Sequence, residues 1–196
     1  MKRFLVDLEP NCFNDISSAI ALYRPGPASN IPLFVKRKKG YEKTSYIVPA
    51  MEDILKETYG IIVYQEQIMQ IATTLASYTL SEADLLRRAM GKKKYEILKK
   101  EEDKFINNCI KNGYSYEIAK QVYDLILAFA NYGFNKSHSV AYSLVAYKMC
   151  YLKAHFPKFF YSNLLEGVIG SEVKTLDYIK ELKRLGIKVL PPDINK

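Results

Sequence analysis

Two adjacent arginines, Arg87 and Arg88, lie in the segment ADLLRRAMGKKK (83–94), where a helical pattern ends in a glycine and three lysines. The chain has 29 Lys and Arg residues, and only six of them are Arg. Lys supplies charge alone, so the few arginines indicate positions that need a planar, bidentate donor, such as a phosphate site. The alternative is a helix C-terminus whose cations offset the macrodipole, and this is the favoured interpretation for Lys92–Lys94.

The loop GFNKSHS (133–139) is a second segment suited to an anion, because it begins with glycine and leads into a predicted helix. The first turn of such a helix offers backbone N–H groups and the positive end of the helix dipole. Lys136 would add charge, and Ser137 and His138 would add donors. N-capping by Ser137 or Ser139 explains the same residues equally simply, and the spacing is not that of a Walker A loop.

The segment YQEQ (64–67) is dense in hydrogen-bonding groups at the point where a β-prone run gives way to helical spacing. Glu66 fits a charge at a helix N-terminus as well as it fits a contact to a base or sugar. Both interpretations remain open at the level of sequence.

Residues for bond-making chemistry are missing from the sequence. Two-metal phosphoryl or nucleotidyl transfer needs converging carboxylates, and no Asp-x-Asp pair occurs; Asp7 and Glu9 come nearest and are expected to be solvated. His138 and His155 are the only histidines, and the three cysteines form no zinc-binding pattern. The chain is therefore predicted to bind phosphate without catalytic residues or a metal site of its own.

The net charge of +8 favours an anionic partner, with nucleic acid as the first candidate and a membrane surface as the second. The N-terminal MKRFLVDLEP lacks the apolar core of a signal peptide, and no apolar run approaches the length of a membrane span. We expect a cytoplasmic protein with free thiols.

Apolar residues recur at intervals near 3.6 positions, in segments bounded by Gly, Pro or Ser, and this pattern predicts a mainly α fold. Ser81 and Asp84 resemble a capping box, and Ser115 is a predicted N-cap. Short strands are expected at 61–64 and after 187, which gives one or two short β-strands in all. The expected helical segments are 11–22, 51–60, 81–91, 94–113, 115–133, 158–170 and 171–186. Two further helices are expected, one after Tyr64 that contains Ile68, Ile71 and Leu75, and one that follows the GFNKSHS loop and stops before Pro157.

Six segments together resemble the α subunit of bacterial DNA polymerase III, the C-family replicative polymerases, in the exonuclease-free form of Gram-positive type. They occur in the family's order and cover essentially the whole chain: ALYRPGP, TYGIIVYQEQIMQIA, ADLLRRAMGKKK, FANYGFNKSHSVAYSLVAY, LKAHFP and LPPDIN. The one departure is Ala28-Ser29-Asn30 after YRPGP, where the family often has a bulkier residue.

The resemblance implies a multi-helix fingers domain cut from a longer chain. Its parts would be a loop-rich segment adjoining the palm (1–60), a nucleotide-facing helical core (61–157) and C-terminal helices leading to a missing domain (158–196). The family's catalytic aspartates, and the Mg²⁺ that they bind, would lie in the absent palm. The isolated fragment is therefore expected to be inactive.

The resemblance also implies site residues. Arg87 and Arg88, with Lys92 and Lys93 as weaker candidates, are similar to residues that meet the triphosphate of the incoming dNTP. The partners would be dNTP, template-primer DNA, the palm and downstream DNA-binding domains and, through the full-length chain, the sliding clamp and other replisome subunits, with no membrane. The residues expected to line the active site, near the templating base, are Arg24, Tyr64, Gln65, Gln67, Asn135, Lys136, Ser137 and His138.

Two other functions are compatible with the same composition. A basic helical module would bind DNA nonspecifically, with a steep salt dependence and no nucleotide role. A docking domain for another replisome protein would instead present an exposed apolar patch.

Overall fold

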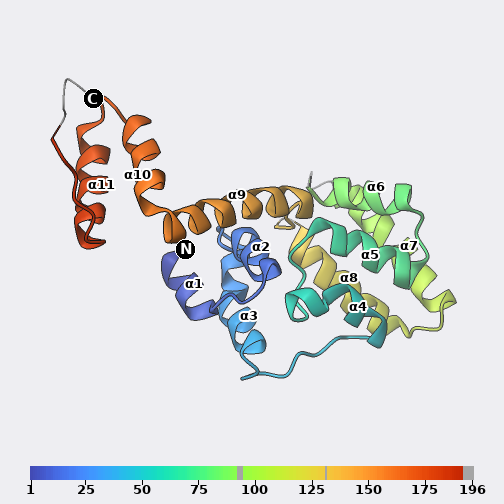
Figure 1. Ribbon diagram of the computed structural model, residues 1–196. Coiled ribbons are helices and arrows are strands. Elements are labelled where there is room, and N and C mark those ends of the chain that lie inside the picture. Colours follow the sequence, from blue (N-terminus) through green and yellow to red (C-terminus); the bar gives the residue numbers. More distant parts are fainter. Residues whose placement is uncertain (92–94, 131, 192–196) are drawn as a thin grey trace. The chain divides into compact units, whose positions relative to one another are not determined.

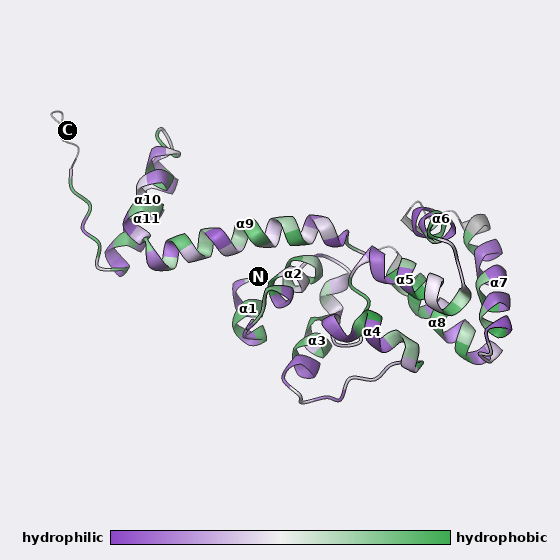
Figure 2. Cartoon of the chain, turned by 45° about the vertical axis from the view of Figure 1, so that its right-hand side comes forward, coloured by the Kyte–Doolittle hydropathy of each residue, from purple (hydrophilic) through white to green (hydrophobic). Residues whose placement is uncertain are grey.

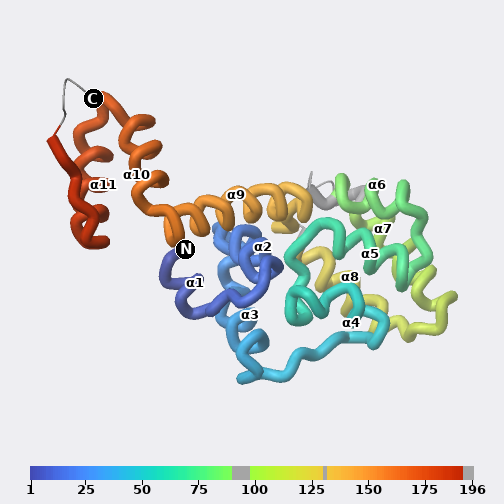
Figure 3. Tube along the Cα trace, in the orientation of Figure 1, coloured from blue at the N-terminus to red at the C-terminus, as the bar shows by residue number. Residues whose placement is uncertain are grey.

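The computed structural model describes residues 1–91, 95–130 and 132–191. It divides the chain into two units, Met1–Ser143 and Leu144–Lys196. Helix α9 (Lys136–His155) contributes to both units. Figure 1 labels the helices, and the tube in Figure 3 follows their order along the chain.

The first unit begins with short helices that pack on one another, as the prolines and glycines of this region predict. Phe4, Leu8, Leu22 and Phe34 from three of these helices are buried. The elements are α1 (Lys2–Leu8), α2 (Phe13–Leu22), η1 (Pro27–Asn30), α3 (Ile31–Lys38), η2 (Pro49–Met51), α4 (Glu52–Leu55) and η3 (Lys56–Thr58).

Four longer helices complete the first unit and pack against one another (Figure 1): α5 (Gln65–Ala76), α6 (Leu80–Gly91), α7 (Tyr95–Lys111) and α8 (Tyr116–Ala130). The apolar spacing of the sequence accounts for their inner faces, because Ile68, Ile71 and Leu75 of α5 are all buried. The predicted N-cap of α8 is confirmed, since Oγ of Ser115 accepts a hydrogen bond from the N–H of Ile118 at 3.3 Å.

The prediction of one or two short β-strands is wrong for the described residues, which contain no strand. Residues 61–63 are buried but belong to no helix or strand, and the sheet-like pairing that follows them is a single bridge between Tyr64 and Phe134. The side-chain oxygen of Gln67 accepts the N–H groups of Val63 and Tyr64 at 2.8 and 3.0 Å, so these donors are not free for a ladder. Residues 187–191 form no strand, and 192–196 lie outside the described residues.

The predicted capping box of α6 is shifted by two residues. Oε2 of Glu82 accepts hydrogen bonds from the N–H and hydroxyl of Thr79, both at 2.8 Å, and Oγ1 of Thr79 accepts the N–H of Glu82 at 3.3 Å. These bonds, led by the backbone N–H of Thr79, lower the pKa of Glu82 to about 2. Ser81 and Asp84 are therefore not the cap, and Asp84 is left for another role.

The tight turn at Gly26 sets the position of the YRPGP loop in the first unit. Gly26 has φ +99° and ψ −75°, and a Cβ added there would overlap the aromatic ring of Tyr132. Only glycine accepts both the dihedral angles and the contact without strain.

Gly26→Ala is expected to lower the free energy of unfolding by about 2–4 kcal/mol, because backbone strain of about 1–3 kcal/mol adds to the overlap. Denaturant unfolding of the 196-residue chain measures the change. Gly40→Ala is the matched control: Gly40 also has positive φ but has nothing within 4 Å of the new Cβ, so about 1 kcal/mol is expected. Equal losses for the two variants would contradict this account of Gly26.

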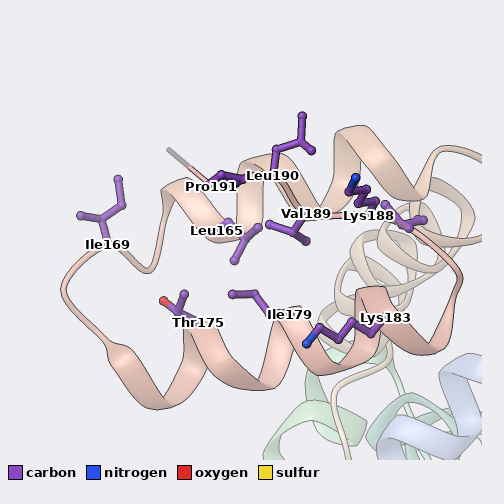
Figure 4. Close-up of a pocket in the computed structure, with 10 residues that line it drawn as sticks. Leu165, Ile169, Thr175, Ile179, Lys183, Lys188, Val189, Leu190 and Pro191 are labelled. Atoms are coloured by element: carbon purple, nitrogen blue, oxygen red, sulfur yellow. The ribbon is translucent and has the colours of Figure 1, made fainter. Parts of the chain in front are cut away.

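The second unit contains the end of α9 with α10 (Pro157–Glu166) and α11 (Glu172–Arg184), which pack against each other. Residues 188–191 run beside these helices, and together they line a groove of about 740 Å³ (Figure 4). Several large apolar side chains of the second unit are exposed, and Ile169 is 84% exposed. Figure 2 colours the chain by hydropathy, from purple for hydrophilic residues to green for hydrophobic ones. Across the described ranges, no helix combines the length and apolar character that a membrane crossing needs.

Candidate functional site

The segments YQEQ and GFNKSHS lie side by side in the first unit, which places the starts of α5 and α9 together. The N–H of Gln65 donates to the carbonyl of Phe134 at 2.9 Å, and the N–H of Phe134 donates to the carbonyl of Val63 at 3.1 Å. Two of the segments that the sequence singled out for anion or nucleotide contacts therefore belong to one surface.

Glu66 ties the start of α9 to α5. Its two carboxylate oxygens accept the backbone N–H of Lys136 at 3.1 and 2.9 Å, and Oε1 also accepts Nδ2 of Asn135 at 3.0 Å. Glu66 lies in the first turn of α5, so one carboxylate faces two helix N-termini. Nζ of Lys136 is 2.6 Å from a carboxylate oxygen of Glu57, which holds the same loop from a second side.

Asn135, and not Ser137 or Ser139, caps α9. Its Oδ1 accepts the N–H of His138 at 2.8 Å and the hydroxyl of Ser137 at 3.0 Å. Asparagine precedes the first helical residue and so reaches the free N–H groups, whereas both serines lie inside the helix. Because the N–H groups of Lys136 and His138 are already bonded, side chains offer the better contacts to a ligand in this loop.

The side chains of Asn135, Ser137 and His138 are exposed, and that of Lys136 is partly exposed. The His138 ring packs between aromatic neighbours, with centroids 5.5 Å from Phe134 and 4.6 Å from Tyr142. This surface offers hydrogen-bond donors and acceptors beside an aromatic face, which suits contacts to a base or sugar.

Arg24 joins the YRPGP loop to the segment before α9. Its Nε donates to the carbonyl of Ala21 at 3.0 Å, Nη2 donates to the carbonyl of Tyr132 at 2.8 Å, and the guanidinium lies 4.2 Å from the Phe134 ring centroid. Burial lowers the pKa of the Arg24 guanidinium. These contacts give Arg24 a bracing role at the edge of the surface.

Tyr64 and Gln67 lie beneath the surface, with exposures of only 2% and 1%. The Tyr64 hydroxyl donates to Oγ of Ser17 at 3.0 Å, and burial raises its pKa. Besides accepting two backbone N–H groups, the Gln67 side chain donates to the carbonyl of Ile54 and to Oγ1 of Thr58. Both side chains are buried, and both support the start of α5, which carries Gln65 and Glu66.

Arg87 and Arg88 share one carboxylate on α6. Nε and Nη2 of Arg87 donate to Oδ1 of Asp84 at 2.9 and 2.7 Å, and Nη2 of Arg88 lies 2.7 Å from Oδ2. Nη1 of Arg87 also donates to Oε1 of Gln65 at 3.2 Å, which joins α6 to the YQEQ segment. The bonds from Arg87, the largest cause, and the charges of both arginines lower the pKa of Asp84.

The two arginines differ in how firmly their side chains are held. The side chain of Arg87 is 30% exposed and bonds to Asp84 on its own helix and to Gln65 on α5. The side chain of Arg88 is 63% exposed and, among the described residues, forms an ion pair with Asp84 alone. Lys92 and Lys93 lie outside the described residues. Within the described part of the chain, no three His, Cys, Asp or Glu side chains converge as metal ligands.

Sequence reasoning missed Asp84 as a partner of the arginine pair, although the signal was present. Residues three and four positions apart share a helix face, so Asp84 was placed to meet both Arg87 and Arg88. Glu57 and Tyr132 gave no such signal, because their contacts to Lys136 and Arg24 depend on the tertiary fold.

The comparisons with known proteins agree with this architecture. The family model described as bacterial DNA polymerase III alpha subunit finger domain matches residues 1–113, more than half of the chain. The chain belongs to this family of polymerase finger domains. It is 52% identical over all 196 residues to DNA polymerase III subunit alpha of Bacillus subtilis (strain 168), and 50% identical to that of Staphylococcus aureus (strain N315). It spans 18% of the length of each of these relatives.

Proposed function

We propose that the chain serves as the fingers of a replicative DNA polymerase and binds the triphosphate of the incoming dNTP. The observation that carries the proposal is the fixed, partly exposed guanidinium of Arg87, bonded by Asp84 on its own helix and by Gln65 on α5. A guanidinium fixed in this way suits phosphate recognition, because its planar donors need little reorganisation when the anion arrives. Arg88 adds a second cation, and Lys92 and Lys93 would extend the positive charge.

The templating base and template-primer DNA would meet the neighbouring surface. Gln65, Asn135, Lys136, Ser137 and His138 present polar and aromatic groups there, and Arg24 braces its edge. Tyr64 and Gln67, which the sequence also suggested as lining residues, would act from beneath.

The rest of the reaction would belong to other parts of the polymerase. Mg²⁺ and the aspartates that hold it would be supplied by the palm, so the isolated chain would not incorporate nucleotides. Downstream domains, the sliding clamp and other replisome subunits would be reached through the full-length protein, in the cytoplasm. The described residues bring together no ligand set for Mg²⁺, so no metal site is proposed on this chain.

Nonspecific DNA binding is the second candidate function, and the net charge of +8 favours it. Arg87→Lys separates the two candidates, because it keeps the charge and removes the planar fork. In a polymerase that carries this chain, we expect Arg87→Lys to lower dNTP incorporation by about 10-fold or more and to leave the salt dependence of DNA binding unchanged. Single-turnover incorporation and DNA binding at several salt concentrations measure the two effects. Wild-type incorporation by the variant would favour nonspecific DNA binding.

A further inference from the structure

Asp84 makes contacts that no capping role explains. Thr79 and Glu82 cap α6, and Asp84 follows one turn later with its two oxygens divided between the arginines. Oδ1 faces Arg87 and Oδ2 faces Arg88. The side chain is 28% exposed, so a carboxylate that could lie free in water is instead bonded to both cations.

The bonds of Arg87 leave two of its N–H donors available. A guanidinium has five N–H donors. Asp84 takes one from Nε and one from Nη2, and Gln65 takes one from Nη1. One donor on Nη1 and one on Nη2 are left without a partner among the described residues. The contacts to Asp84 and Gln65 fix the plane of the group, and therefore the directions in which these two donors point.

Arg88 is held differently. In the described part of the chain its ion pair joins Nη2 to Asp84, and the side chain is 63% exposed. Exposed ion pairs of this kind are weak, so a multiply charged phosphate competes well for the same guanidinium. The negative charge of Asp84 also offsets the repulsion between the two guanidiniums until such an anion binds.

We propose that Asp84 is a positioning residue for nucleotide incorporation. It orients the Nη1 and Nη2 groups of Arg87 toward the triphosphate. It also holds Arg88 in place until Arg88 exchanges the carboxylate for a phosphate oxygen. This proposal rests on the triphosphate-binding function proposed above. It adds that one carboxylate, which the sequence suggested only as part of a helix cap, sets the geometry of both arginines.

Asp84→Asn tests the proposal in a polymerase α subunit that carries this chain. Asparagine has the same shape but no negative charge to bind both guanidiniums. Single-turnover incorporation over a range of dNTP concentrations gives the maximal rate and the apparent dNTP Kd. We expect the maximal rate to fall about 10-fold, because a misdirected donor costs most in the transition state. The Kd should change by less than about 3-fold, since the loss of a negative charge near the triphosphate offsets the loss of orientation.

A double variant shows whether Asp84 acts through Arg87. In an Arg87→Ala background, Asp84→Asn should lower the rate by less than about 3-fold further. Asp84→Glu, which keeps the charge, should restore much of the rate lost in Asp84→Asn. Asp53→Asn is the matched control, because Asp53 forms an i,i+3 ion pair with Lys56 on an exposed surface, and no change in either kinetic constant is expected.

Two results would overturn the positioning role: an unchanged maximal rate in Asp84→Asn, whatever happens to the Kd, or the same fold loss of rate with and without Arg87. If Arg87→Ala itself left both kinetic constants unchanged, the proposed function would fail as well. If Arg87→Ala impairs incorporation and Asp84→Asn does not, only the positioning role fails.

Discussion

Arg87→Ala is expected to lower the efficiency of dNTP incorporation by about 100-fold or more in a polymerase that carries this chain. The substitution removes the guanidinium that Asp84 and Gln65 hold between α6 and α5. Donors placed before the reaction stabilise the charge that develops on the phosphates, so their loss lowers the maximal rate and raises the dNTP requirement. Single-turnover kinetics measures both constants, and Arg88→Ala should have a smaller effect because Arg88 is less firmly held.

Arg184→Ala serves as the matched control for Arg87→Ala. Arg184 is 72% exposed at the end of α11 and pairs three residues back with Glu181. Its removal takes away the same charge and the same side-chain volume, and we expect incorporation to be unchanged. Equal losses in the two variants would point to a general charge effect and against triphosphate contact by Arg87.

Gln67→Leu is expected to destabilise the chain by about 3–4 kcal/mol, the largest loss of stability that we predict. Its side chain is 1% exposed and accepts the N–H groups of Val63 and Tyr64 while donating to Ile54 and Thr58. Leucine has a similar volume but leaves the N–H groups of Val63 and Tyr64 without partners, and each unpaired buried group costs about 1–3 kcal/mol. Denaturant unfolding of the 196-residue chain gives the free energy directly.

Gln70→Leu is the control for this prediction, because Gln70 lies on the same helix and is exposed. A change within about 0.5 kcal/mol is expected for it. If Gln67→Leu were equally mild, the buried hydrogen bonds of Gln67 would not be what holds residues 61–64 in place.

The helical part of the fold could be predicted from the sequence because local signals agree there. The spacing of Ile68, Ile71 and Leu75 set the inner face of α5, and Ser115 marked the start of α8. The strand prediction failed because β propensity in residues 61–64 says nothing about the partner of their backbone N–H groups. In the structure the partner is the side-chain oxygen of Gln67, and this contact is visible only in the folded chain.

The sequence suggested candidate residues for the site but not their arrangement. The scarcity of arginine indicated Arg87 and Arg88, and helical spacing placed Asp84 within their reach. The joining of YQEQ to GFNKSHS depends on the bridge from Tyr64 to Phe134, which no local pattern encodes. For the same reason, the sequence did not distinguish Gln65, which is partly exposed, and Asn135, which is exposed, from Gln67, which lies in the core.

A structure of the polymerase with template-primer DNA and an incoming dNTP tests the central claim most directly. We predict that Nη1 or Nη2 of Arg87 lies about 2.7–3.2 Å from a phosphate oxygen of the nucleotide. Asp84 should remain on the Nε edge of Arg87. A bound triphosphate held by other residues, with Arg87 still directed only at Asp84 and Gln65, would contradict the account.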